Sequence, residues 1–282
     1  MHVNIVHKKR NHIGENDDEV THILHSKQMI DTSKFDLPLS KTKINVVLVL
    51  NGCFNPIHRH HILTLEVARE HLISLGKYHI VGGYLLPSHD GSIEQKSIGT
   101  QVRWQDRLAM CQLMVQDSLW IAVDDWKLYQ EKNYGSYIAQ KRLLKILRET
   151  FPSIEIVSTC GTDALPKFQT SFTEGLTICV RNRPFDRFQF DAWFFSEDIQ
   201  KYHHNIIIID DPTANKNISS TIIRECIRQN QLDSIIDDLH PSVLAYHQDK
   251  GIDYRPNGNS SILVSDSKSK STDQSDTIVE EN

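Results

Sequence analysis

Short, continuously apolar runs alternate with stretches of helical periodicity through the middle of this chain. Branched residues, with flanking glycine, proline or asparagine, predict strands at residues 44–50, 79–86, 119–123, 154–158, 176–180 and 206–209. Apolar residues at helical spacing predict helices at residues 60–75, 104–116, 136–150 and 219–229. Apolar strands that alternate with helices are typical of an α/β fold, in which a parallel sheet is covered on both faces.

The two ends of the chain lack this pattern. Residues 1–42 are polar and weakly patterned, which predicts a flexible leader. Residues 253–282 are rich in Ser, Asp, Lys and Asn and poor in aromatic residues, which predicts a disordered tail. We therefore expect one folded domain at residues 43–252.

Composition narrows the class of protein. The 282 residues include 39% hydrophobic ones, and the formal net charge of -5 provides no overall basic field for nucleic acid. Five cysteines without a CxxC pair favour free thiols in a reducing compartment. The sequence shows no signal peptide and no apolar run of membrane-spanning length. We expect a soluble, cytoplasmic or nuclear protein that binds neither nucleic acid nor a membrane; a homo-oligomer is compatible with the sequence.

The strand-to-helix junction at residues 51–61 is the strongest candidate for chemistry. Gly52 lets the backbone come close to a ligand, and Pro56 ends regular structure before the helix. His58 and His61 are three residues apart at the helix start, so their imidazoles share one side with the free backbone amides. Such a helix end binds phosphate oxygens. The alternative is an ordinary helix start with surface histidines.

Two later segments carry weaker signals of the same kind. In Ile218–Arg224, Ser219 or Ser220 either caps a helix or holds phosphate, and the arginine adds a fixed charge one turn later. In Cys160–Asp163, directly after a strand, the glycine lets a ligand lie against the backbone and the carboxylate can hold ribose hydroxyls. Taken alone, the first of these segments is more typical of a plain helix cap.

In combination, the three segments resemble a known family. Gly52–His61 resembles the GSFNP-I-(H/T)-x-x-H signature of nicotinamide/nicotinate mononucleotide adenylyltransferases, which belong to the nucleotidyltransferase superfamily. Ile218–Arg224 resembles that family's ISSTxxR signature, and Gly161–Asp163 its G-x-D. The order of the motifs also matches, over roughly residues 44–250. The resemblance implies a Rossmann-like, doubly wound fold. It also implies transfer of adenylate from ATP, with Mg²⁺, to a pyridine mononucleotide, giving NAD or deamido-NAD and pyrophosphate.

The resemblance also implies roles for individual residues. His61, His58 and Arg224 would be catalytic, through contacts with the ATP phosphates. The remaining ATP-binding residues would come from both signatures: Gly52, Cys53, Phe54, Ser219, Ser220, Thr221, Ile222 and Ile223. Substrate binding would use Lys96 for the mononucleotide phosphate, Trp126 for the pyridine ring, Gly161 and Asp163 for ribose, and Arg181 for the nucleotide. No residue is assigned as a direct metal ligand.

The sequence departs from the family pattern in places. Cys53 replaces the usual serine, and His60 stands where glycine or methionine is more common. The stretch from Asp163 to Gly175 is shorter than in related eukaryotic enzymes and lacks a tryptophan that completes the pyridine sandwich. The choice between amide and acid acceptor therefore stays open. The alternatives are another nucleotidyltransferase, with a different acceptor or CTP, and a nucleotide-binding sensor or chaperone without turnover.

Overall fold

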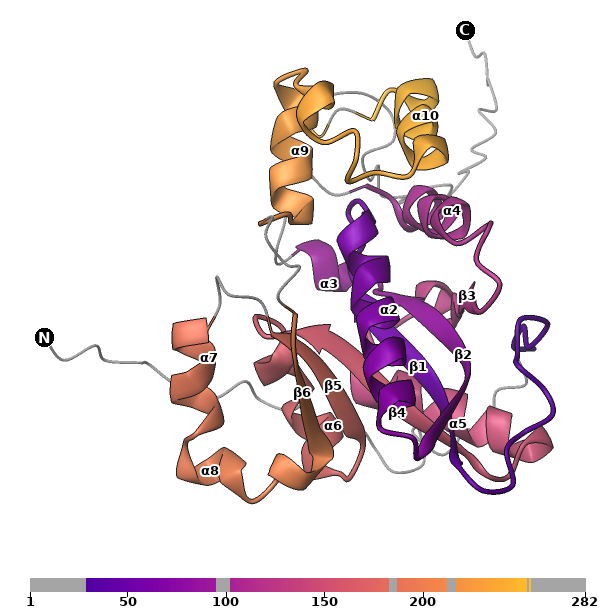
Figure 1. Cartoon of the computed structure of the whole chain (residues 1–282). Helices are drawn as coiled ribbons and strands as arrows, with labels where there is room; N and C mark the ends of the chain where they lie inside the picture. The colour runs from indigo at the N-terminus through magenta and orange to yellow at the C-terminus, as the bar shows by residue number, and fades with distance from the viewer. Residues whose placement is uncertain (1–28, 95–101, 183–186, 212–216, 253, 255–282) are drawn as a thin grey trace, which may run out of the picture.

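The chain is built around a sheet of parallel strands (Figure 1). This computed structural model describes residues 29–94, 102–182, 187–211, 217–252 and 254. The strands are β1 (Ile44–Gly52), β2 (Tyr78–Pro87), β3 (Ile121–Val123), β4 (Ile154–Gly161), β5 (Thr177–Asn182) and β6 (Ile206–Asp210). Their order in the sheet is β3-β2-β1-β4-β5-β6, and every neighbouring pair is parallel. This is the strand order of a doubly wound Rossmann-like sheet, so the predicted fold class is confirmed.

Helices connect the strands on both sides. Their bounds are α2 (Arg59–Ser74), α3 (Gly91–Glu94), α4 (Trp104–Met114), α5 (Ser136–Thr150), α6 (Gln169–Thr173), α7 (Arg187–Phe194), α8 (Glu197–Gln200), α9 (Ser220–Arg228) and α10 (Pro241–Lys250). The helices predicted from periodicity are α2, α4, α5 and α9, with ends that differ from the prediction by two residues or fewer. The sequence pattern did not single out α7 or α10, which have 8 and 10 residues.

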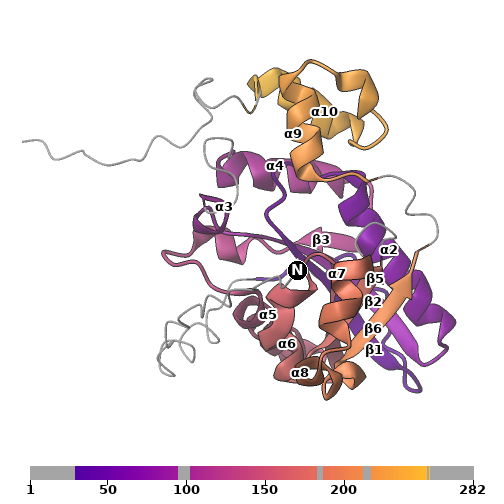
Figure 2. The ribbon, with the colours of Figure 1, turned by 90° about the vertical axis from the view of Figure 1, so that its left-hand side faces the viewer.

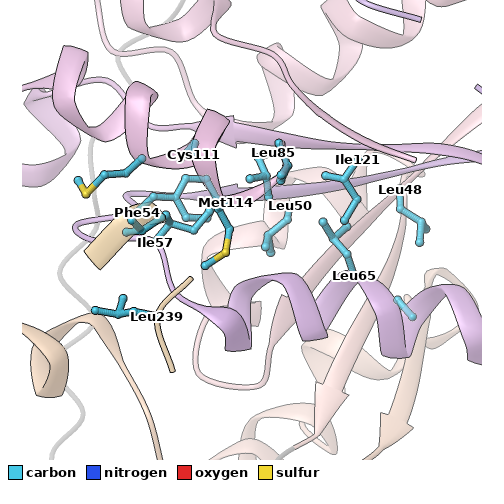
Figure 3. Close-up of a cluster of buried hydrophobic side chains, with 14 of the residues drawn as sticks. Leu48, Leu50, Phe54, Ile57, Leu65, Leu85, Cys111, Met114, Ile121 and Leu239 are labelled. Carbon is cyan, nitrogen blue, oxygen red and sulfur yellow. The ribbon is translucent and has the colours of Figure 1, made fainter. Parts of the chain in front are cut away.

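The alternation of side chains along β1 divides the core into two layers. Val46, Leu48 and Leu50 face α2, α4 and the segment that contains α9 and α10. Val47 and Val49 face α5 on the opposite side of the sheet. Both layers are apolar because a central parallel strand is buried on both faces. Figure 3 shows the first layer, in which Phe54 and Ile57 of the loop after β1 lie among core side chains.

The C-terminal helices gather at one end of the molecule. Figures 1 and 2 show α9 and α10 together beyond α4, next to the start of α2. Ile223, Leu239 and Val243 from this segment belong to the same buried cluster as β1 and α2. The C-terminal segment is therefore part of the main core.

Residues before β1 also contact both layers of the core. The Phe35 ring packs against Tyr84 and Phe151, with ring centroids 6.1 and 5.6 Å apart. The Lys34 ammonium group donates to the carbonyl oxygens of Val115 and Ile121, each at 2.9 Å. Part of the predicted leader is thus packed against the sheet, and the boundaries predicted at residues 43 and 252 stay predictions. Among the described residues, no helix is long and apolar enough to cross a membrane.

Candidate functional site

A cavity of about 510 Å³ opens where the strand order reverses, between the carboxyl ends of β1 and β4. Open α/β sheets bind ligands at this point, because loops from adjacent strands diverge there. Three stretches line most of the cavity: residues 50–64, 160–168 and 218–224. The motifs that lie far apart in the sequence therefore meet in one site.

The loop after β1 delivers two histidines to the cavity wall. His58 precedes the first residue of α2, and its backbone N–H donates to Nδ1 of His61 at 3.1 Å. The two imidazole centroids are 3.7 Å apart, and the centroid of the nearly perpendicular Phe54 ring lies 5.1 Å from that of His61. The His61 side chain thus reaches back across the helix start, as the third residue of a capping box does. The arrangement places imidazole and helix amides together, which suits an anion.

The start of α9 forms a second wall. Ser219 caps the helix, with its hydroxyl oxygen accepting from the Ile222 amide at 3.3 Å. The Ser220 hydroxyl instead donates to the Pro56 carbonyl oxygen at 2.9 Å, joining α9 to the loop after β1. Ile223 is fully buried in the core, and neither Ile222 nor Ile223 lines the cavity. Their side chains anchor the helix from behind.

Arg224 links the same two elements. Its guanidinium donates to the Asn55 carbonyl oxygen at 2.7 Å and to the Thr221 hydroxyl at 3.1 Å. Burial lowers the pKa of this guanidinium, with the nearby cation Arg228 as a smaller cause in the same direction. Arg224 lines the cavity, so its charge reaches the site even though two of its donors hold protein oxygens.

The exits of β4 and β5 form the third wall. Gly161 and Asp163 line the cavity, as does the almost fully buried Arg181. Arg181 donates through Nε to the Asp211 carboxylate at 2.6 Å and through Nη1 to the His60 carbonyl oxygen at 3.4 Å. Arg181 therefore ties the end of β5 to the first turn of α2.

The comparisons with known proteins agree with this geometry. The sequence profile of the cytidylyltransferase-like family matches residues 49–226, which is more than half of the chain. The chain belongs to the cytidylyltransferase-like family.

Curated relatives of this chain are named as mononucleotide adenylyltransferases. Nicotinamide/nicotinic acid mononucleotide adenylyltransferase 2 of Xenopus tropicalis is 43% identical over 90 residues, which are 32% of this chain and 28% of that protein. The Arabidopsis thaliana nicotinamide/nicotinic acid mononucleotide adenylyltransferase is 28% identical over 203 residues, 67% of this chain and 82% of that one. The match to the Xenopus protein thus spans less than a third of that relative. The resemblance inferred from the motifs is confirmed at the level of the family.

A solved structure shares the fold of this cytidylyltransferase-like chain. Plasmodium falciparum nicotinic acid mononucleotide adenylyltransferase, complexed with APC, superposes with a TM-score of 0.52 at 18% sequence identity. The superposition covers 74% of this chain and 96% of that one. At this level of identity the likeness supports the Rossmann-like architecture.

Among the predicted substrate residues that the structure describes, Trp126 does not line the cavity. Trp126 is only 2% exposed and belongs to the core on the α5 side of the sheet. It stacks on Tyr134 at 5.7 Å and lies under the guanidinium of Arg142 at 5.0 Å. In this arrangement its indole faces protein, so stacking on a pyridine ring stays a prediction. Lys96 lies outside the described residues.

Sequence reasoning did not identify several other residues that line the cavity. Lys167 and Phe168 line the cavity from the short helix Leu165–Phe168, directly after the G-x-D motif. Ser88 lines it from the segment after β2, and Ser136 from the first turn of α5. Because Lys167 lies only four residues after Asp163, the sequence could have indicated it as a site residue. Neither serine could be identified from the sequence, because serines are common both in loops and at helix starts.

The His60 imidazole distinguishes this family member from the usual motif. It lines the cavity, and its Nε2 lies 3.4 Å from the Asp238 carboxylate in the segment before α10. Asp238 also accepts the Arg59 amide through its backbone carbonyl at 2.8 Å. The histidine that departs from the usual motif is therefore paired with a carboxylate from the C-terminal segment.

Proposed function

We propose that this chain is an adenylyltransferase that transfers AMP from Mg-ATP to nicotinamide or nicotinate mononucleotide. The products would be NAD or deamido-NAD and pyrophosphate. The observation that carries the proposal is the meeting of residues 52–61, 161–163 and 218–224 around one cavity at the switch point of the sheet. Relatives that carry the adenylyltransferase name support the same substrates.

The proposed reaction places few demands on acid–base chemistry. The acceptor is a phosphate monoester, whose second pKa of about 6 leaves it largely ionised at neutral pH. One of its oxygens attacks the α-phosphorus of ATP, and the bond to the β-phosphate oxygen breaks as pyrophosphate leaves. The barrier is the approach of two anions in line, which positioning and charge neutralisation lower.

The cavity residues suit those tasks. We propose that His61 contacts the α-phosphate, with His58 beside it and the α2 amides facing the same oxygens. The first turns of α9, from Thr221 to Arg224, would hold the β- and γ-phosphates. Gly161 and Asp163 would hold ribose, and Arg181 would bind the nucleotide.

A divalent ion that binds together with the nucleotide fits this chemistry. Among the described residues, no group of three His, Cys, Asp or Glu side chains lies close enough to hold a metal. Mg²⁺ keeps several waters and is commonly bound through substrate phosphates and few protein carboxylates. When bound, it would neutralise part of the triphosphate charge.

The test is a product assay with purified full-length protein. Incubation with Mg-ATP and either mononucleotide is expected to yield pyrophosphate and the matching dinucleotide, measured by chromatography. Omitting the mononucleotide is the control. Folded protein that forms no dinucleotide from either acceptor would overturn the proposal. Turnover with CTP instead would indicate a cytidylyltransferase, and ATP binding without pyrophosphate release a sensor or chaperone.

The proposed substrates are small molecules, and we place the activity in the cytoplasm or nucleus. Free thiols support a reducing compartment, because Cys111, Cys160 and Cys179 are buried and unbridged in the core. Localisation of a tagged full-length chain by microscopy checks this placement.

A further inference from the structure

Arg107 of α4 is a fully buried cation that the sequence did not single out. Its guanidinium donates through Nη1 to the Cys53 carbonyl oxygen at 2.7 Å, and through Nη2 to the Ser88 carbonyl oxygen and the Asp90 carboxylate, both at 2.7 Å. Nε donates to the Val102 carbonyl oxygen at 3.3 Å. A buried charge needs such compensation, and here most of its acceptors are backbone carbonyls from three separate segments.

These acceptors border the cavity. Cys53 and Ser88 both line it, and they directly follow the ends of β1 and β2. The Ser88 amide also donates to the Gly52 carbonyl oxygen at 2.8 Å, so the two strand exits are joined. Because a peptide unit is planar and trans, a carbonyl held on one side sends the following N–H to the other. Fixing the Cys53 carbonyl therefore fixes the direction of the Phe54 amide.

Two residues of α9 also hold this loop. Arg224 binds the Asn55 carbonyl oxygen, and Ser220 binds that of Pro56. The Asn55 side chain accepts from the Val102 amide at 3.2 Å, next to the Arg107 anchor. The loop between β1 and α2 is thus held at three of its carbonyls by donors from two elements, with Arg107 as the donor from α4.

We propose that Arg107 is a positioning residue, which sets the backbone of the loop after β1 against the β2 exit and so aligns its amides for a phosphate group. Arginine suits this role because its planar fork reaches several oxygens at once. Lysine offers three donors from a single atom and cannot span the same carbonyls. The effect of Arg107 on catalysis rests on the proposed adenylyl transfer. Its effect on the geometry of the loop does not depend on that function.

The test compares Arg107→Lys and Arg107→Met with Arg103→Lys in the full-length chain. Arg103 is a matched control, because it lies one turn earlier and its side chain is 45% exposed, 3.8 Å from Asp106. The thiol of Cys53 is a partly exposed reporter within the loop. Its alkylation rate with iodoacetamide is followed by mass spectrometry, alongside the ATP dissociation constant and the thermal midpoint. The Arg107 variants are expected to change the alkylation rate and weaken ATP binding by about tenfold each, the equivalent of one charge-assisted hydrogen bond.

A lower thermal midpoint with unchanged Cys53 reactivity and ATP affinity would overturn the proposal, since a purely structural residue gives that result. If the methionine variant does not fold, the lysine variant and Asp90→Asn, which weakens the same anchor, decide the question. If the wild-type chain forms no dinucleotide, the proposed function fails, while the alkylation rates still decide the role of Arg107.

Discussion

At the residue scale, some side chains face the cavity, buried cations hold the backbone around it, and Arg224 does both. His58, His60 and His61 border the cavity at the head of α2. Arg107 and Arg224 direct their guanidinium groups to loop carbonyls. The histidines and Arg224 could be predicted from local motif spacing. Arg107 could not, because one arginine in a helical pattern resembles a surface cation until the tertiary contacts are known.

His61 is the residue whose loss should affect catalysis most directly. We expect His61→Asn to lower the rate of dinucleotide formation by about a hundredfold, because one preorganised donor to developing phosphate charge is worth about 3 kcal/mol. Steady-state kinetics with Mg-ATP and mononucleotide measure the effect. His71→Asn, in the last turn of the same helix, is the matched control and should keep wild-type rates. A His61 variant as active as this control would contradict the assigned role.

At the element scale, the decisive junction is the exit of β1. Gly52 has no side chain, and the Phe54 ring packs over its α-carbon. A β-carbon at this position would meet Phe54 ring atoms at 2.5 and 2.8 Å. The ring cannot move aside easily, because Phe54 is only 1% exposed and lies in the main core (Figure 3). The glycine thus permits close packing of strand exit and loop.

Gly52→Ala should therefore disturb the loop through Phe54. We expect a loss of about 1–3 kcal/mol in the free energy of unfolding, typical of overpacking in a core, together with weaker ATP binding. Urea denaturation and calorimetric titration measure the two effects. Gly135→Ala is the control, because a β-carbon there meets nothing within 4 Å. Equal behaviour of the two alanine variants would show that the Phe54 contact is unimportant.

At the scale of the whole molecule, the C-terminal segment closes the core behind the cavity. The Tyr246 hydroxyl of α10 donates to the Asp106 carboxylate of α4 at 2.8 Å. His247 is buried beside Tyr254, whose hydroxyl lies 3.3 Å from its Nε2. Burial lowers the pKa of His247 from 6.5 to about 4, against smaller opposing effects from the Ile252 backbone and Asp106.

This buried imidazole makes stability depend on pH. Above pH 6.5 His247 is neutral in the folded and unfolded chains, so its contribution is complete. Between pH 6.5 and about 4 only the unfolded chain binds the proton, so stability falls by about 3 kcal/mol. Urea denaturation across this range should show a smaller loss for His247→Phe than for wild type or His71→Asn. Parallel pH profiles for all three proteins would contradict the prediction.

The sequence by itself determined the local elements and the motifs. Runs of branched residues predicted the strands, helical spacing predicted α2, α4, α5 and α9, and glycine at the ends of β1 and β4 marked where a ligand can approach. These features depend on neighbours within a few residues, which is why one sequence suffices to predict them.

Only the tertiary structure decided which side chains share the site. The strand order brings Gly52, Gly161 and Ser220 around one cavity, although up to 168 residues separate them. It also buries Trp126 in the opposite layer and converts Arg107 into an anchor for the loop after β1. Periodicity tells which face of an element is apolar but not which element it meets, because that choice depends on long-range packing.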